Sequence, residues 1–101
     1  MPHARKSAFA SPYIGLIQRL VTRRHELGMT QEQLGSAFGE DQSFISRVER
    51  CQRRIDVYEF VRLCLILGLK PSAILDAMEE EAAAPSGTEG TDRRSVRPWP
   101  A

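Results

Sequence analysis

The sequence predicts an all-α fold of five helices, and three observations carry that prediction. Apolar residues recur at three- and four-residue steps, as Ile14, Ile17 and Val21 do. Residues that favour helix starts precede such segments, and glycines follow several of them. No segment has the pattern of a credible β-strand. At 101 residues the chain has room for one domain.

Local signals at the helix ends define the first two helices. The first is expected to start at Pro12, with Ser11 as its N-cap, and to end at Gly28. Thr30 then begins a second helix with the spacing of a capping box, in which side chain and backbone bond reciprocally. Gly39 ends this helix after about two turns.

Three further helices follow from the same kinds of signal. Asp41 is the expected N-cap of the third helix. Asp56 begins a fourth, again with capping-box spacing, and Gly68 ends it. Pro71 opens a fifth helix that runs to Ala84. Because the connections are short, these helices are expected to pack into one domain.

Composition divides the chain into three parts. Residues 1–11 have no period and are expected to form a flexible basic arm; Arg5 and Lys6 would either enter a DNA minor groove or belong to an inert terminus. Residues 12–84 form the predicted helical domain. The Pro, Ser, Gly, Thr and Arg of residues 85–101 cannot build a core, so this tail is expected to be disordered.

Charge is informative through its distribution, since the net charge is only +1. The first thirty residues carry five Arg and Lys residues against Glu26 alone. Acidic residues cluster near the end of the predicted fold, at Asp76 and Glu79–Glu81. This layout suits a molecule that turns one face to a polyanion and an acidic face away from it.

Several classes of protein are not expected. Cys51 and Cys64 form neither a CxxC pair nor a metal-ligand spacing, and no nucleophile–base pair or phosphate-cradling loop is present, so we expect no metal, cofactor or enzymatic activity. The N-terminus lacks the apolar core of a signal peptide, and no run approaches the roughly 18 apolar residues of a membrane span. We expect a protein of the reducing cytoplasm, associated with the nucleoid.

The segment Thr30–Glu49 has the most informative spacing in the chain. Two short helices meet at Gly39, where a positive φ is permitted, and Gly35 supplies a small residue where the two backbones approach. The second of these helices presents Gln, Ser and Arg, side chains that address base edges in a DNA major groove. The spacing is therefore typical of a compact DNA-reading module.

On these residues the chain resembles the helix-turn-helix family typified by lambda-type phage repressors and Cro, also called the XRE family, in its bacterial or prophage form. The resemblance covers residues 13–78 and rests on Thr30-Gln31, Leu34-Gly35, Phe38-Gly39, Ile45-Ser46-Arg47-Val48-Glu49 and Leu67-Gly68-Leu69. It implies a five-helix lambda-repressor-like domain with the helix-turn-helix at helices two and three.

The resemblance also implies that the start and exposed face of the third helix read bases. The expected base-reading residues are Gln42, Ser43, Phe44, Ser46 and Arg47. Gln42 suits adenine and Arg47 suits guanine as bidentate partners, and the edge of Phe44 would lie on a thymine methyl. Phe44 is expected to be exposed because Ile45 and Val48 already occupy the inward face of this helix.

Contacts to the DNA backbone are implied in the same way. Gln31, at the start of the second helix, would anchor a phosphate and buttress the reading helix. Arg53 and Arg54 stand where the family's loop grips the backbone through charge. Arg24 and Glu49 match a structural ion pair between the first and third helices of the family.

The two cysteines have different expected roles. The family usually has Gly where Cys51 stands, so a positive φ at this position would strain the cysteine. Its basic neighbours Arg50, Arg53 and Arg54 favour thiolate, which leaves open a redox sensor at the DNA face beside an ordinary cysteine. Cys64 is expected to be a small core residue.

The fourth helix is more apolar than a one-sided helix requires, with a continuous run over 63–67. We therefore expect a C2 dimer through the fourth and fifth helices, whose interface comprises Leu65, Ile66, Leu69, Ile74 and Met78. Such a dimer would present its reading helices about 34 Å apart, to match a palindromic operator on double-stranded DNA.

Together these expectations describe a sequence-specific DNA-binding transcription regulator that represses by covering a promoter as a homodimer. An antitoxin is the alternative: it would autoregulate its operon and bind a toxin through the surplus apolar surface or residues 85–101. A protein-interaction module that has lost DNA binding is a further rival, against which the polar front of Gln42, Ser43 and Arg47 argues.

Overall fold

The computed structural model describes residues 10–83 of the chain. Five helices follow one another in this range: α1 (Ser11–Glu26), α2 (Gln31–Phe38), α3 (Gln42–Glu49), α4 (Val57–Leu67) and α5 (Pro71–Ala83). Residues 10–83 contain no strand, so the predicted all-α fold of five helices is confirmed. The predicted arm and tail fall almost entirely on residues 1–9 and 84–101, outside the described residues.

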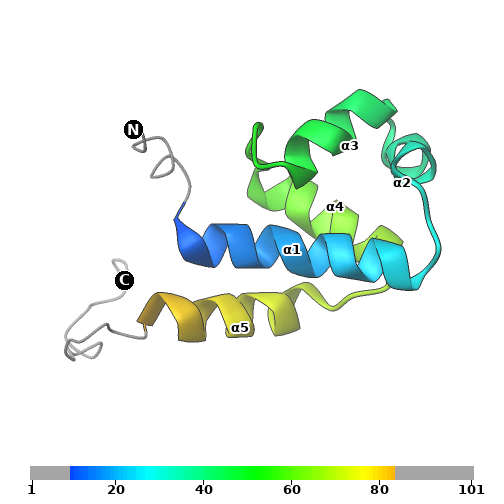
Figure 1. Ribbon diagram of the computed structural model, residues 1–101. Coiled ribbons are helices and arrows are strands. Elements are labelled where there is room, and N and C mark those ends of the chain that lie inside the picture. Colours follow the sequence, from blue (N-terminus) through cyan, green and yellow to red (C-terminus); the bar gives the residue numbers. More distant parts are fainter. Residues whose placement is uncertain (1–9, 84–101) are drawn as a thin grey trace.

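Helix α1 runs through the middle of the molecule (Figure 1) and contacts α3, α4 and α5. Helix α5 lies along one side of α1, while α2 and α3 lie on the opposite side. Helix α4 packs behind this arrangement against α1, α2 and α5. The α2–α3 pair therefore packs on the other helices, with α2 against α4 and α3 against α1.

One apolar cluster holds all five helices together. Its buried members are Tyr13, Leu16, Ile17, Leu20, Leu34, Phe38, Phe44, Ile45, Val48, Phe60, Leu63, Cys64, Leu67 and Ile74. Removing a large aliphatic or aromatic side chain from water contributes about 1.5–3 kcal/mol to stability. Cys64 is completely buried, which confirms its predicted place in the core.

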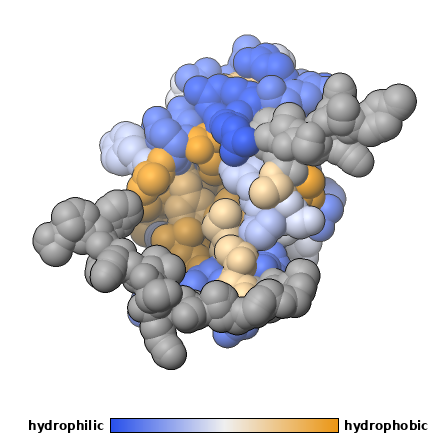
Figure 2. Space-filling model, turned by 90° about the vertical axis from the view of Figure 1, so that its left-hand side faces the viewer, coloured by the Kyte–Doolittle hydropathy of each residue, from blue (hydrophilic) through white to orange (hydrophobic). Residues whose placement is uncertain are grey.

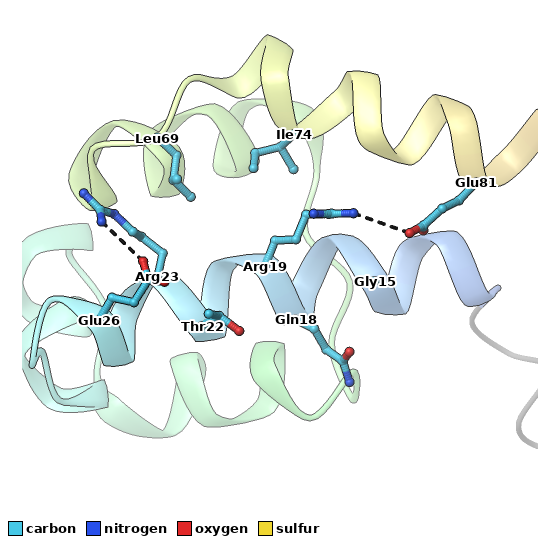
Figure 3. A pocket seen from close by; sticks show the side chains of 9 residues that line it. All are labelled: Gly15, Gln18, Arg19, Thr22, Arg23, Glu26, Leu69, Ile74 and Glu81. Carbon is cyan, nitrogen blue, oxygen red and sulfur yellow. Dashed lines mark hydrogen bonds and ion pairs between the residues drawn. The ribbon is translucent and has the colours of Figure 1, made fainter.

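Two residues depart from their predicted positions. Ile74 was expected in a dimer interface, but it is 8% exposed and belongs to the core of its own protomer. The reason is that α5 folds back along α1 and turns Ile74 inward (Figure 3). Ser11 was expected to be an N-cap but is the first residue of α1, and Ala10 precedes it. Pro12 in the first turn has no N–H to satisfy, so the turn needs fewer partners.

The predicted starts at Thr30, Asp41 and Asp56 and the predicted turn at Gly39 are confirmed, while the predicted end at Ala84 lies outside the described residues. Thr30 and Asp56 each form a reciprocal capping box with the residue three positions on. Asp41 accepts a hydrogen bond from the backbone N–H of Phe44, at 2.9 Å. Gly39 ends α2 in the left-handed region, with a φ of 93°. These local bonds satisfy backbone groups that helix ends otherwise leave unpaired.

The contact between α1 and α5 is more open than the core beneath it. Between these helices runs a groove of about 460 Å³, and six of the nine residues that line it are polar or charged (Figure 3). An ion pair of 3.4 Å between Arg19 and Glu81 crosses it, and both side chains are more than 40% exposed. None of the helices in 10–83 combines the length and apolarity needed to cross a bilayer.

Candidate nucleic-acid interface

The α2–α3 pair has the tight turn that its glycines predict. A Cβ atom placed on Gly35 would lie 2.9 Å from the carbonyl oxygens of both Glu40 and Asp41. Only a glycine therefore lets the turn pass this close to α2. The predicted close approach at Gly35 is confirmed.

Most of the predicted reading residues lie together on α3. Gln42, Ser43 and Arg47 are exposed, and Ser46 is half-buried. Arg47 donates a hydrogen bond from Nη1 to the Ser43 hydroxyl at 3.1 Å, one helical turn away. The upper part of the molecule, the height at which α3 lies, is hydrophilic (Figure 2). This polar front is accessible to a large partner.

Phe44 is not part of that front, and its predicted exposure is wrong. Its side chain is 5% exposed and stacks on Phe38, with ring centroids 5.4 Å apart and planes inclined by 18°. It therefore cannot lie on a thymine methyl. The physical reason is helical spacing: Phe44 and Val48 are four residues apart, so both face the core beside Ile45.

A chain of charged and polar side chains connects the interior to the front of α3. Arg24, only 7% exposed, binds Glu49 through two hydrogen bonds of 2.6 and 3.0 Å. The predicted ion pair between α1 and α3 is thus present. Gln31 donates from Nε2 to Glu49 at 2.8 Å, and Gln42 donates from Nε2 to Gln31 at 2.6 Å. We call these four residues the polar relay.

The ion pair at one end of the polar relay determines the orientation of the side chain at the other end. A carboxylate only accepts hydrogen bonds, so Gln31 must donate to Glu49 and turn its oxygen toward Gln42. Gln42 must then donate through Nε2. Within residues 10–83 the Gln42 oxygen and its second N–H have no hydrogen-bond partner, so both are available to a bound molecule.

The two predicted phosphate contacts after α3 differ from each other. Arg53 is half-buried and donates two hydrogen bonds to Glu59, at 3.0 and 3.2 Å. This pairing raises the pKa of Arg53 and lowers the pKa of the Glu59 carboxyl. Arg54 is exposed, and its guanidinium lies 5.2 Å from the ring centroid of Tyr13. Arg54 is therefore the more accessible of the two cations.

Cys51 adopts the conformation in which the family prefers glycine, with a φ of 58°. This left-handed conformation costs an L-residue about 1–2 kcal/mol. Burial raises the pKa of the Cys51 thiol and outweighs the opposing charge of Arg54. The raised pKa disfavours the thiolate on which the redox-sensor hypothesis depends.

Sequence reasoning missed Arg62, which supports the end of α2. Arg62 donates a hydrogen bond of 2.6 Å to the carbonyl oxygen of Phe38, and its guanidinium lies 4.2 Å from the Phe38 ring centroid. It thereby satisfies a carbonyl in the last turn of the helix. No local pattern could reveal this contact, because the partners are 24 positions apart.

Comparisons with known proteins agree with this geometry. A helix-turn-helix family model matches residues 21–74. A solved structure, described as an XRE-family like protein from Pseudomonas syringae pv. tomato str. DC3000, is 35% identical with a TM-score of 0.68. The alignment covers 79% of this chain and 98% of that one. The chain belongs to the XRE family. No curated protein matches it.

As an XRE-family protein, the chain has a lambda-repressor-like fold with a helix-turn-helix DNA-binding domain, and the family is not one of enzymes. The family match spans α2, α3 and α4 in full, together with the last six residues of α1 and the first four of α5. It therefore includes the whole polar front and all four residues of the polar relay.

Proposed function

We propose that this XRE-family protein is a transcription regulator that binds a palindromic operator as a homodimer and represses by occlusion. The observation that carries the proposal is the exposed Gln42, whose amide is oriented by the polar relay before any DNA is present. A side chain that is already ordered loses less conformational entropy on binding. In a cell, such a protein would be found at the chromosome.

In this proposal the N-terminal half of α3 enters the major groove. The free oxygen and N–H of Gln42 suit the N6 and N7 groups of adenine, and Arg47 suits the two acceptors of guanine. Each bidentate contact would contribute about 1–3 kcal/mol of discrimination. Ser43 and Ser46 flank these residues on the same helix and would add hydrogen bonds to bases or to bridging water.

Backbone contacts would fix the position of α3 without reading sequence. Arg54, exposed after α3, and Gln31, at the amino-terminal end of α2, are the proposed phosphate ligands. Gln31 would then bind a phosphate while its amide also donates to Glu49 and accepts from Gln42. Neutralising phosphates releases counterions, so binding should weaken steeply as salt increases.

The proposed dimer uses apolar surface that the protomer leaves uncovered on α4 and α5. Leu65 is 66% exposed, and Ile66, Leu69 and Met78 are half-buried at the edge of the core. Apolar side chains also meet the solvent below the hydrophilic upper part in Figure 2. A twofold axis through this surface would repeat α3 about 34 Å away, one turn of DNA.

Selection of bound sequences from random double-stranded DNA tests the proposal. The wild type should enrich an inverted repeat, and Gln42→Ala and Arg47→Ala should each relax the preference at one position of the half-site. Gln18→Ala is the matched control, because Gln18 is an exposed residue of α1 away from the polar front. Absence of any enriched sequence with the wild type would overturn the proposal.

The antitoxin alternative makes the same use of α3 and differs at α4 and α5. There the uncovered apolar side chains, Leu65 foremost, would bind a toxin in place of a second copy. Purification from the native host distinguishes the two: a second small protein held in fixed proportion favours the antitoxin. A homodimer that alone accounts for operator binding favours the repressor.

A further inference from the structure

Arg53 is engaged within the protomer, although its place in the loop after α3 suggested a phosphate contact. We propose that Arg53 is a positioning residue that holds the reading helix α3 in orientation through Phe44 and Glu59, and not a phosphate ligand. This inference rests on the proposed function, because the orientation of α3 matters only if α3 reads DNA. Three sets of contacts support it.

The first is a column of stacked groups that links α2, α3 and α4. The Arg53 guanidinium lies 4.5 Å from the ring centroid of Phe44, on which Phe38 stacks at 5.4 Å. Arg62 of α4 lies 4.2 Å from the Phe38 ring centroid. Two aromatic rings are thus held between two cations, an arrangement in which each cation–π contact adds to simple burial.

The second is the hydrogen bonding of Arg53 itself. Its Nη1 donates to the Arg54 carbonyl oxygen at 2.7 Å and to Glu59 at 3.0 Å, while Nη2 donates to the other Glu59 oxygen. The Glu59 side chain is only 19% exposed. A phosphate would have to displace this fork and leave a largely buried carboxylate without its cation, which is unfavourable.

The third is the anchoring of Glu59 at the start of α4. Glu59 closes the capping box by accepting a hydrogen bond of 2.9 Å from the backbone N–H of Asp56. The Glu59 carboxylate that binds Arg53 is therefore itself held in place by the backbone at the start of α4. Because Phe44 lies between the exposed Ser43 and the buried Ile45 on α3, holding its ring also restricts the rotation of α3 about its axis.

Glu59→Gln separates the two roles of Arg53. A glutamine keeps the capping box, since its oxygen can still accept from Asp56, but its NH₂ group opposes Arg53 Nη2 and breaks the fork. If Arg53 is a positioning residue, this change weakens specific DNA binding by about tenfold, because α3 is less well ordered before it binds. If Arg53 is a phosphate ligand, freeing it and removing a negative charge strengthens binding.

The experiment compares wild type, Arg53→Ala, Arg54→Ala and Glu59→Gln on the selected DNA over a series of salt concentrations. The plot of log K against log salt has a negative slope, and loss of one phosphate contact reduces its magnitude by about 0.9. We expect that change for Arg54→Ala only. Arg53→Ala and Glu59→Gln should lose affinity at unchanged slope, and Arg53→Lys should not restore it, because a lysine cannot make the fork.

A measurement without DNA completes the test. Amide hydrogen exchange over 42–47 in the free protein should be faster in Arg53→Ala and Glu59→Gln than in the wild type, and unchanged in Arg54→Ala. A reduced salt slope in Arg53→Ala, or equal exchange in all four proteins, would overturn the positioning role. A wild type without sequence-specific binding would instead overturn the proposed function, and the exchange result would still decide whether Arg53 orders α3.

Discussion

Helices α3 and α5 differ in how firmly the protomer itself holds them. Helix α3 has eight residues, of which Phe44, Ile45 and Val48 are buried, and Asp41 caps its start. Helix α5 has thirteen residues, of which Ile74 alone is buried. Its outer end is joined to α1 through an ion pair of exposed side chains. The longer helix is therefore the less firmly held.

This difference matches what each region is proposed to do. A reading helix gains specificity when its side chains are ordered before binding, and α3 has both a stacked column and a polar relay to order them. The α4–α5 side instead leaves Leu65 and Leu75 exposed to solvent. Apolar surface of this kind is commonly covered by a partner.

The largest expected effect is the loss of the Phe44 ring. Phe44→Ala should lower the free energy of unfolding by about 3–5 kcal/mol, because it removes a buried aromatic side chain and leaves a cavity against Phe38. Urea denaturation measures the change. Leu75→Ala on α5 is the matched control and should change stability by about 0.5 kcal/mol or less. Similar losses of stability in both variants would show that the protomer holds α3 and α5 equally firmly.

Two glycines allow the same comparison with one added methyl group. In Gly35→Ala the new Cβ would meet two backbone carbonyl oxygens at 2.9 Å, so we expect a loss of about 1–3 kcal/mol. In Gly15→Ala the nearest atom, also at 2.9 Å, is the carboxylate end of Glu81, which can move aside. Helix propensity then makes the second change neutral or stabilising by up to about 1 kcal/mol. Thermal unfolding that showed the reverse order would contradict the comparison.

The Arg53–Glu59 pair should make stability depend on pH. Hydrogen bonding to Arg53 lowers the pKa of Glu59 below its ordinary value of 4.5. A depressed pKa means that the carboxylate stabilises the fold fully above the unfolded pKa and loses this effect as pH falls through the folded value. The pair is partly in solvent, so we expect an advantage over Glu59→Gln of about 0.5 kcal/mol at neutral pH.

Denaturation of both proteins at a series of pH values checks this expectation, and the difference between them should close in acid. Glu81→Gln is the matched variant on α5. It should change stability less than Glu59→Gln does, because the Arg19–Glu81 ion pair is longer and both of its side chains are more exposed. A gap that stayed constant with pH would show that the charge of Glu59 is not responsible.

The smallest expected effect on protomer stability comes from the exposed residue of α4. Leu65→Ser should change the free energy of unfolding of the monomer by no more than about 0.5 kcal/mol. Dimerisation should nevertheless weaken by at least about tenfold if Leu65 lies in the interface, as sedimentation equilibrium would show. Gln18→Ser on α1 is the control. An unchanged association constant would show that Leu65 lies outside the dimer interface.

Much of the fold could be predicted because its signals are local. Thr30, Asp41 and Asp56 cap helices through bonds to residues three positions away, so the residue types alone identify the helix starts. Gly39 likewise identifies the turn, because few other residues adopt its φ of 93°. The Arg24–Glu49 pair followed from the family resemblance and not from local spacing.

The two errors have different origins. Ile74 is buried because α5 folds back on α1, which no local pattern reveals. Phe44 faces the core by helical spacing, where Phe38 and Arg53 cover its ring. Helical spacing alone could have placed Phe44 beside Val48, which lies one turn further along the same face. For Arg53 no such signal exists, since its contacts depend on how the first turn of α4 places Glu59 beside the loop.

The bond between Gln42 and Gln31 has a consequence for how the DNA preference of this chain can change. A substitution at Gln42 removes the partner of the Gln31 oxygen, while Gln31 keeps its bond to Glu49; a substitution at Gln31 removes the acceptor that orients Gln42. The two positions are therefore coupled through a hydrogen bond, although they are 11 residues apart. If Gln42 reads a base as proposed, retargeting the protein to a new operator should therefore require paired substitutions at Gln31 and Gln42.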